Sequence, residues 1–100
     1  MADRLAYAGR DLESMAFARN YHRWILDLFA PHLGTRLVEV GAGTGSFSEL
    51  LIERRPASLT LVEPSPDMHR RLVERVGREG AGLRIYNDTF AGVAARVARQ

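Results

Sequence analysis

The stretch Leu37-Val38-Glu39-Val40-Gly41-Ala42-Gly43-Thr44-Gly45-Ser46-Phe47 decides the fold of this chain. Its first four residues form a short run suited to a buried β-strand, and three glycines then follow at alternate positions. A helix is predicted to begin near Ser46. Glycine has no Cβ, so its backbone can adopt positive φ and approach a bound molecule closely, while the first N–H groups of the helix point toward that molecule. The stretch therefore predicts a binding loop for a nucleoside-containing cofactor.

The spacing of the glycines distinguishes between the common nucleotide-binding loops. A phosphate-binding P-loop ends in Gly-Lys-Ser or Gly-Lys-Thr, and this chain contains no lysine. A dinucleotide-binding fingerprint has its third glycine three residues after the second, where this chain has Ser46. The third glycine comes one residue earlier, at Gly45. This spacing weakens the prediction of an NAD-binding oxidoreductase but does not exclude it.

Glu39 stands two residues before the first glycine. A carboxylate at the end of a buried strand repels a pyrophosphate but suits a ligand that carries a positive charge or hydroxyl donors. With Gly41, Gly43 and Gly45, it forms the pattern acid-x-Gly-x-Gly-x-Gly, which resembles motif I of the class I S-adenosylmethionine-dependent methyltransferases. The resemblance implies S-adenosylmethionine as cofactor, with the loop that includes Ala42 near its amino acid portion. It also implies that Glu39 supports the loop or receives the cofactor's ammonium through water.

Length and composition restrict the remaining possibilities. One hundred residues, of which 46% are hydrophobic, can form one domain with a core. No apolar run of about twenty residues and no leader pattern is visible, so neither a membrane span nor a signal peptide is predicted. Because the chain lacks cysteine, the default expectation is a cytoplasmic protein. The net charge of +2 comes from scattered arginines, which does not favour a nucleic-acid partner.

Residues 1–34 are predicted to form an N-terminal helical segment, in which an approach segment leads into an amphipathic helix. Apolar residues of this helix recur at three- and four-residue steps, at Leu12, Met15, Tyr21, Trp24, Ile25, Leu28 and Phe29. Pro31 and Gly34 end the helix, which is expected to cover one face of a sheet. Aromatic residues often precede motif I in the methyltransferases that the chain resembles, so Tyr7 or Tyr21 is a candidate for the border of the cofactor pocket.

Residues 35–100 alternate between strands and helices. The predicted strands are Thr35 or Arg36 to Val40, Leu59 to Val62 and Leu83 to Tyr86. The predicted helices are Ser46 to Arg55, Pro66 to about Gly77 and Phe90 to Arg99. This alternation predicts an α/β fold with a parallel sheet and right-handed crossovers. The resemblance implies that the segment is the first half of a methyltransferase domain: a Rossmann-like three-layer sandwich of strand order 3-2-1-4-5-7-6, truncated after about three strands.

Two further carboxylates follow the second and third predicted strands. Glu63 comes 22 residues after Gly41, close to the separation of about 20 at which an acidic residue accepts hydrogen bonds from both ribose hydroxyls. The alternative is an ordinary surface glutamate. Asp88 matches the acid that binds the adenine amino group in the family, and the backbone N–H of Thr89 would reach a ring nitrogen. Alternatively, Asp88 caps the helix that begins at Phe90.

The helix after Glu63 has a clear start signal. Ser65 is a suitable N-cap, with Pro66 at the first helical position, and Pro64 belongs to the predicted cofactor-binding loop. Met68 is predicted to contact the adenine face or to pack in the core. The inward-facing residues of this helix are predicted to be Met68, Leu72, Val73 and Val76.

The first strand, 37–40, is expected to be central and buried on both faces, yet a sheet truncated after three strands leaves one of its edges unpaired. Such an edge invites self-association. No catalytic residue is predicted, and no pair among the three histidines has metal-ligand spacing. The predicted function is methyl transfer to an unidentified acceptor, small molecule or other, with this chain supplying the cofactor-binding half. The alternatives are a non-catalytic Rossmann-like interaction module and the oxidoreductase.

Overall fold

Strands and helices alternate along the chain after residue 35, as predicted. The computed structural model describes residues 2–80 and 82–98, and the side chains of residues 16–80 and 82–96. The elements are α1 (Ala2–Phe29), the 3₁₀-helix η1 (Ala30–His32), β1 (Arg36–Val40), α2 (Ser46–Glu53), β2 (Ser58–Val62), α3 (Pro66–Val76), β3 (Leu83–Tyr86) and α4 (Phe90–Ala98).

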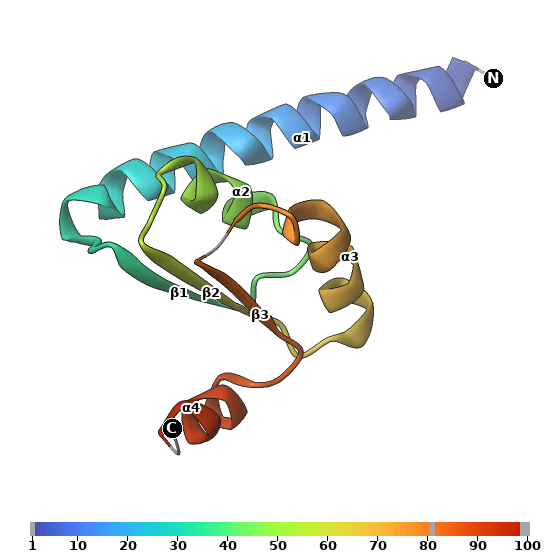
Figure 1. Ribbon diagram of the computed structural model, residues 1–100. Coiled ribbons are helices and arrows are strands. Elements are labelled where there is room, and N and C mark those ends of the chain that lie inside the picture. The colour runs from blue at the N-terminus through green and yellow to red at the C-terminus, as the bar shows by residue number, and fades with distance from the viewer. Residues whose placement is uncertain (1, 81, 99–100) are drawn as a thin grey trace.

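The three strands form one parallel sheet in the order β1-β2-β3. Helices α1, α2 and α3 lie on one side of this sheet, which we call the upper side, and α4 lies on the other, the underside (Figure 1). The α/β class, the parallel sheet and the three layers predicted from the sequence are confirmed.

The main core lies between the sheet and the upper helices. In the register of the sheet, Leu37 of β1 is beside Leu59 of β2, so their side chains share the upper face. The buried residues of this core are Leu26, Leu37, Ala42, Leu50, Leu51, Leu59, Leu61, Leu72 and Val76. Complete burial of one leucine contributes about 1.5–3 kcal/mol to stability. This core therefore fixes the strands whose ends carry the predicted binding residues.

Helix α1 differs from the prediction in its start and in its apolar pattern. It begins at Ala2, so the expected approach segment is itself helical. Leu26 is buried against the core, but Phe17, Trp24 and Leu28 are 73%, 57% and 57% exposed. Each residue of a helix turns by about 100°, which places these three side chains about 160–180° from Leu26. The apolar residues of α1 therefore occupy two opposite faces, and the prediction of one stripe was wrong.

Helix α3 begins as the sequence indicates: the Ser65 hydroxyl accepts a hydrogen bond from the backbone N–H of Met68 at 3.3 Å. The helix buries Leu72 and Val76, whereas Met68 and Val73 are exposed, so the prediction that all four face inward was wrong. Val73 is turned by about 100° from Leu72. Met68 shares the face of Leu72 but lies one turn nearer the helix start, beyond the edge of the core.

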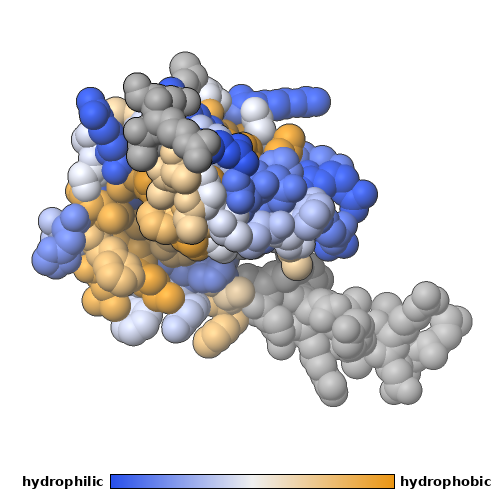
Figure 2. Space-filling view, turned by 90° about the horizontal axis from the view of Figure 1, so that it is seen from below, coloured by the Kyte–Doolittle hydropathy of each residue, from blue (hydrophilic) through white to orange (hydrophobic). Residues whose placement is uncertain are grey.

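Strand β1 is buried less than the sequence suggested. Leu37 is buried on the upper face, while Val38 and Val40 are 58% and 57% exposed on the underside. On this side α4 carries the buried Val93, and Val62 of β2 is fully buried, but β1 is left uncovered. Apolar side chains are gathered on the underside in Figure 2. The prediction that β1 is buried on both faces was therefore wrong for this chain.

None of the helices that the structure describes combines the length and the apolar composition of a membrane span.

Candidate functional site

The predicted binding residues follow the carboxyl ends of three parallel strands, which lie at one edge of the sheet (Figure 1). The loops that leave this edge are 41–45 after β1, 63–65 after β2 and 87–89 after β3. In open α/β sheets, ligands bind outside the carboxyl ends of the strands. This carboxyl edge of the sheet, which is distinct from the unpaired side of β1, is therefore the candidate site.

The loop after β1 is anchored to the neighbouring strand. The backbone N–H groups of Gly41 and Ala42 both donate to the carbonyl oxygen of Val62, at 2.8 and 3.1 Å. Gly41, Gly43 and Gly45 adopt positive φ of 73°, 60° and 96°, a region that favours glycine.

The three glycines differ in their surroundings. A Cβ added to Gly41 or Gly43 would meet no atom within 4 Å, whereas a Cβ on Gly45 would lie 2.9 Å from the Cδ1 atom of the buried Leu72. Gly45 is therefore needed for packing between the loop and α3. Gly41 and Gly43 instead face open space at the candidate site, where a ligand can approach the backbone closely.

Glu63 joins two of the loops. Its Oε1 atom accepts a hydrogen bond from the Gly43 N–H at 2.8 Å, and its Oε2 atom accepts one from the Ser65 N–H at 2.8 Å. The residue is only 7% exposed, so the alternative of an ordinary surface glutamate was wrong. An ionised carboxylate has about four acceptor positions, so each oxygen keeps capacity for a further donor.

Asn87 connects the ends of β2 and β3. Its side-chain amide donates to the carbonyl oxygens of Glu63 and Pro64, at 2.9 and 3.1 Å. We did not assign a role to this residue from the sequence. The pairing of Val62 with Tyr86 places Asn87 directly after β3, as Glu63 is directly after β2, and this correspondence could have indicated it.

Asp88 and Thr89 are turned toward α4. The Asp88 carboxylate accepts from the backbone N–H of Thr89 at 2.7 Å and pairs with Arg96. The Thr89 hydroxyl accepts from the Gly92 N–H at 3.1 Å, so Thr89 caps α4 and the alternative that Asp88 is the cap was wrong. The Thr89 N–H, predicted to reach an adenine nitrogen, is bound to Asp88 in this structure. Sequence reasoning missed Arg96 because its partner lies eight residues away.

Glu39 lies on the upper face of β1 and accepts a hydrogen bond from the hydroxyl of Ser48, a fully buried residue of α2. Burial raises the pKa of the Glu39 carboxyl above its ordinary value of 4.5, and the Ser48 hydrogen bond acts in the opposite direction. The carboxyl therefore ties β1 to the first turn of α2, next to the glycine loop. Sequence reasoning missed Ser48, because its hydrogen-bond partner Glu39 is known only from the fold.

A pH-dependent stability is expected from Glu39. Because its pKa is raised in the folded state, the folded protein holds this proton more tightly than the unfolded chain. Its contribution to stability is complete below pH 4.5 and is lost as the pH rises through the folded-state pKa. Relative to Glu39→Gln, which keeps an acceptor for Ser48, the wild type should lose stability across this window.

Urea denaturation of both proteins at intervals between pH 4 and pH 8 measures this difference. Glu74→Gln serves as the control, because it removes the same charge from an exposed position of α3. A wild type that gains stability relative to Glu39→Gln as the pH rises would contradict the assignment.

The remaining predicted residues are not joined to the cluster around Glu63. Met68 is 39% exposed, and Tyr21 is 49% exposed on α1 with its ring centroid 6.4 Å from Phe17 and 6.0 Å from Trp24. The side chain of Tyr7 lies outside the described residues. Within the described part of the chain, no group of three or more His, Cys, Asp or Glu residues could hold a metal ion.

Comparison with known proteins relates this chain to methyltransferases in sequence and in fold. No protein-family model matches the chain. An uncharacterized methyltransferase of Exiguobacterium sibiricum is 38% identical over 68 residues, which are 68% of this chain and 31% of the relative. The chain thus spans about a third of the length of this relative.

Two crystal structures of the methyltransferase domain of the bacterial protein CtHen1 have a similar fold. The CtHen1-C structure superimposes with a TM-score of 0.61 at 14% identity, over 69% of this chain and 39% of that domain chain. The CtHen1-CN structure gives 0.57 at 17% identity, over 68% and 40%. At these identities the likeness concerns the fold, which confirms the Rossmann-like architecture predicted from the sequence.

Proposed function

Since this chain is related in sequence to a methyltransferase and shares the fold of methyltransferase domains, we propose that it binds S-adenosylmethionine at the carboxyl edge of its sheet. In this proposal the chain supplies the cofactor-binding half of a methyl-transfer enzyme. The observation that carries it is the buried Glu63 carboxylate, which is hydrogen-bonded to Gly43 of the glycine loop, where both Gly41 and Gly43 face open space.

The chemistry of the residues supports this cofactor. S-adenosylmethionine has no phosphate, so the Glu39 carboxylate beside the glycine loop does not repel it as it would a pyrophosphate. When bound, it supplies a methyl group activated by a sulfonium, while the protein contributes position and orientation. The space beside Gly41 and Gly43 fits the close approach of its amino acid portion.

The proposed contacts with the nucleoside involve two carboxylates. Glu63 would accept hydrogen bonds from the two ribose hydroxyls at the acceptor positions that Gly43 and Ser65 leave free. Asp88 would accept a hydrogen bond from the adenine amino group while it remains paired with Arg96. Pro64 is exposed in the loop 63–65, and Met68 offers an exposed apolar surface for the adenine ring.

Calorimetric titration with S-adenosylhomocysteine tests the proposal. A dissociation constant on the order of micromolar is expected, corresponding to about −8 kcal/mol. NAD⁺ at the same concentrations should give no saturable heat, because Ser46 replaces the third glycine of the dinucleotide fingerprint and the Glu39 carboxylate stands beside the loop where a pyrophosphate would lie. Circular dichroism on the same sample establishes that the chain is folded. A folded chain that binds NAD⁺ and not S-adenosylhomocysteine would support the oxidoreductase instead.

A non-catalytic interaction module is the second candidate. It is favoured because both Glu63 oxygens and the Asp88 carboxylate already bind donors of the protein itself. A purely structural role would need such contacts. Under this alternative, the folded chain has no affinity for either nucleoside cofactor.

A further inference from the structure

A cavity of about 370 Å³ lies on the upper side of the sheet, where α1 passes over the start of α2 and the last turn of α3 (Figure 1). Its lining residues come from all three helices and are Ala16, Ala18, Arg19, His22, Ser46 and Arg75. These six residues lie outside the three loops of the candidate site, although Ser46 directly follows Gly45. The composition of the lining indicates what this cavity can bind.

The polar side chains of the lining supply hydrogen-bond donors. Arg19 and His22 from α1 contribute a guanidinium and an imidazole, and Arg75 from α3 contributes a second guanidinium. A guanidinium is always charged and has N–H donors but no acceptor. Among the described residues, no carboxylate lines the cavity. A lining of this kind attracts an anion.

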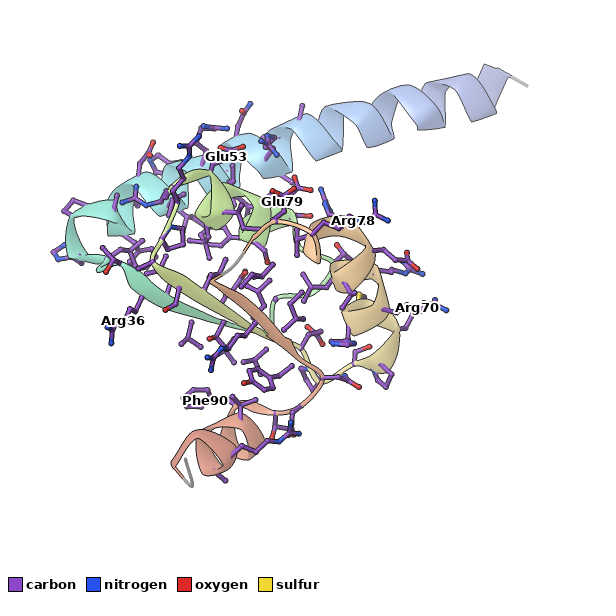
Figure 3. All side chains as sticks on the ribbon, in the orientation of Figure 1. Arg36, Glu53, Arg70, Arg78, Glu79 and Phe90 are labelled. Carbon is purple, nitrogen blue, oxygen red and sulfur yellow. The ribbon has the colours of Figure 1, made fainter. Side chains whose placement is uncertain are left out.

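The carboxylates that pair with these arginines line a different cavity. Glu49 of α2 accepts hydrogen bonds from Nη1 of Arg19 at 3.4 Å and from Nε of Arg75. Glu53 accepts one from Nη2 of Arg19 at 2.9 Å. Together with Glu79, these two glutamates line a neighbouring cavity that Arg75 also contacts, and Glu53 and Glu79 both lie on the upper side of the sheet (Figure 3). The ion pairs therefore separate a basic cavity from an acidic one.

Both guanidinium groups keep donors for a ligand. Arg75 donates to Glu49 and, from Nη1, to the Ser46 hydroxyl at 3.2 Å. Arg19 likewise makes two hydrogen bonds to carboxylates. A guanidinium has five N–H groups, so within the described contacts each arginine has further donors. The side chains of Arg19 and Arg75 are 45% and 38% exposed, so a ligand from solution can reach them.

Two further observations favour a polar ligand in this cavity. The Nδ1 atom of His22 is buried and has no hydrogen-bond partner among the described residues, whereas buried polar atoms of folded proteins nearly always have one. In addition, α2 begins at Ser46, and its N-cap Gly45 has no side chain that could cap the first N–H groups of the helix. The positive end of a helix dipole stabilises a nearby anion.

We propose that this cavity binds the phosphate group of a small-molecule ligand, at a site separate from that of the cofactor. A carboxylate has two oxygens in one plane, which a single guanidinium can bind. The donors of this cavity instead come from three helices. A phosphate monoester has three acceptor oxygens and a charge of about −1.5 to −2, so it suits donors that approach from several sides. The volume leaves room for an organic portion of the ligand.

An NMR titration of the isotope-labelled chain with inorganic phosphate tests this proposal. The backbone amide of Ser46 and the side-chain N–H signals of Arg19 and Arg75 should shift saturably. Phosphate should bind at least about tenfold more tightly than acetate, because acetate engages fewer of the donors. Sodium chloride should weaken the binding, since the arginines are partly exposed and their charges are screened.

Two variants on different helices identify the residues that bind phosphate. Arg19→Gln and Arg75→Gln each remove one charged donor group and should weaken phosphate binding by about tenfold or more. Arg70→Gln is the matched control, because Arg70 also lies on α3 and is paired with a carboxylate, that of Asp67, but does not line the cavity. Its phosphate affinity should equal that of the wild type. Circular dichroism establishes that each variant is folded.

Three results would overturn the phosphate site. These are the absence of a saturable shift, equal affinity for acetate and phosphate, and equal loss of affinity in Arg70→Gln and Arg75→Gln. A second titration, in saturating S-adenosylhomocysteine, should give the same phosphate affinity. Displacement of phosphate would assign the cavity to the amino acid end of the cofactor and contradict a separate site, while the proposed function would stand. Phosphate binding by a chain that does not bind S-adenosylhomocysteine would contradict the proposed function alone.

Discussion

Replacement of Glu63 by alanine is expected to abolish binding of S-adenosylhomocysteine and to lower the free energy of unfolding by about 2–4 kcal/mol. The carboxylate is 7% exposed and accepts hydrogen bonds from the backbone N–H groups of Gly43 and Ser65. A fully buried donor left without a partner costs about 1–3 kcal/mol. Gly43 and Ser65 are half-buried, so each is expected to contribute about 1–2 kcal/mol, the lower part of that range. The same change removes the acceptors proposed for the ribose hydroxyls, so stability and affinity should fall together.

Two variants separate these contributions. Glu63→Gln keeps one acceptor oxygen but turns an NH₂ group toward a backbone donor, so its stability should lie between those of the wild type and the alanine variant. Glu74→Ala removes a carboxylate from an exposed position of α3 and should change neither quantity. Urea denaturation gives the free energy of unfolding, and calorimetry gives the affinity. Wild-type stability and affinity in Glu63→Ala would show that Glu63 is not the support of this site.

Gly45→Ala is expected to lower the free energy of unfolding by about 2–5 kcal/mol, for two additive reasons. A left-handed conformation, here φ of 96°, costs a residue with a Cβ about 1–2 kcal/mol. The new Cβ would also lie 2.9 Å from the Cδ1 atom of Leu72, whose side chain is fully buried. Overpacking of this kind costs about 1–3 kcal/mol.

Gly43→Ala is the matched control for the glycine loop. Its φ of 60° is also positive, but the added Cβ meets no atom within 4 Å. Only the backbone cost of about 1–2 kcal/mol is expected. The Cβ would instead occupy the space proposed for the cofactor, so affinity for S-adenosylhomocysteine should fall more in Gly43→Ala than stability does. If Gly43→Ala were instead less stable than Gly45→Ala, this result would contradict the different roles assigned to the two glycines.

Much of the fold is predictable from local sequence. Short apolar runs locate all three strands, and Ser65 followed by Pro66 marks the start of α3 correctly. These features succeed because they depend on neighbours in the chain. The exposure of Val38 and Val40 was not predictable in the same way, since it depends on where α4 lies relative to β1. Likewise, the two apolar faces of α1 are distinguished only by which of them α2 covers.

The candidate site is also predictable only in part. The position of Glu63 follows from its separation from Gly41, and its burial agrees with a site role rather than a surface one. The cofactor contacts of Glu63 and Asp88 stay predictions. Ser48, Asn87 and Arg96 were missed because each binds a partner from another element of the fold. Polar side chains of this kind carry no local pattern, since a serine or arginine on a helix is ordinary until its partner is known.

The hydrogen bond from Gly43 to Glu63 has a consequence for the thermodynamics of ligand capture. It holds the glycine loop in shape through the protein's own groups, and the bonds from Gly41 and Ala42 to Val62 do the same on the other side. Fixing one residue of a flexible backbone costs about 1–2 kcal/mol in entropy. For this loop that cost is met during folding, so little of the intrinsic binding free energy is spent on ordering the loop.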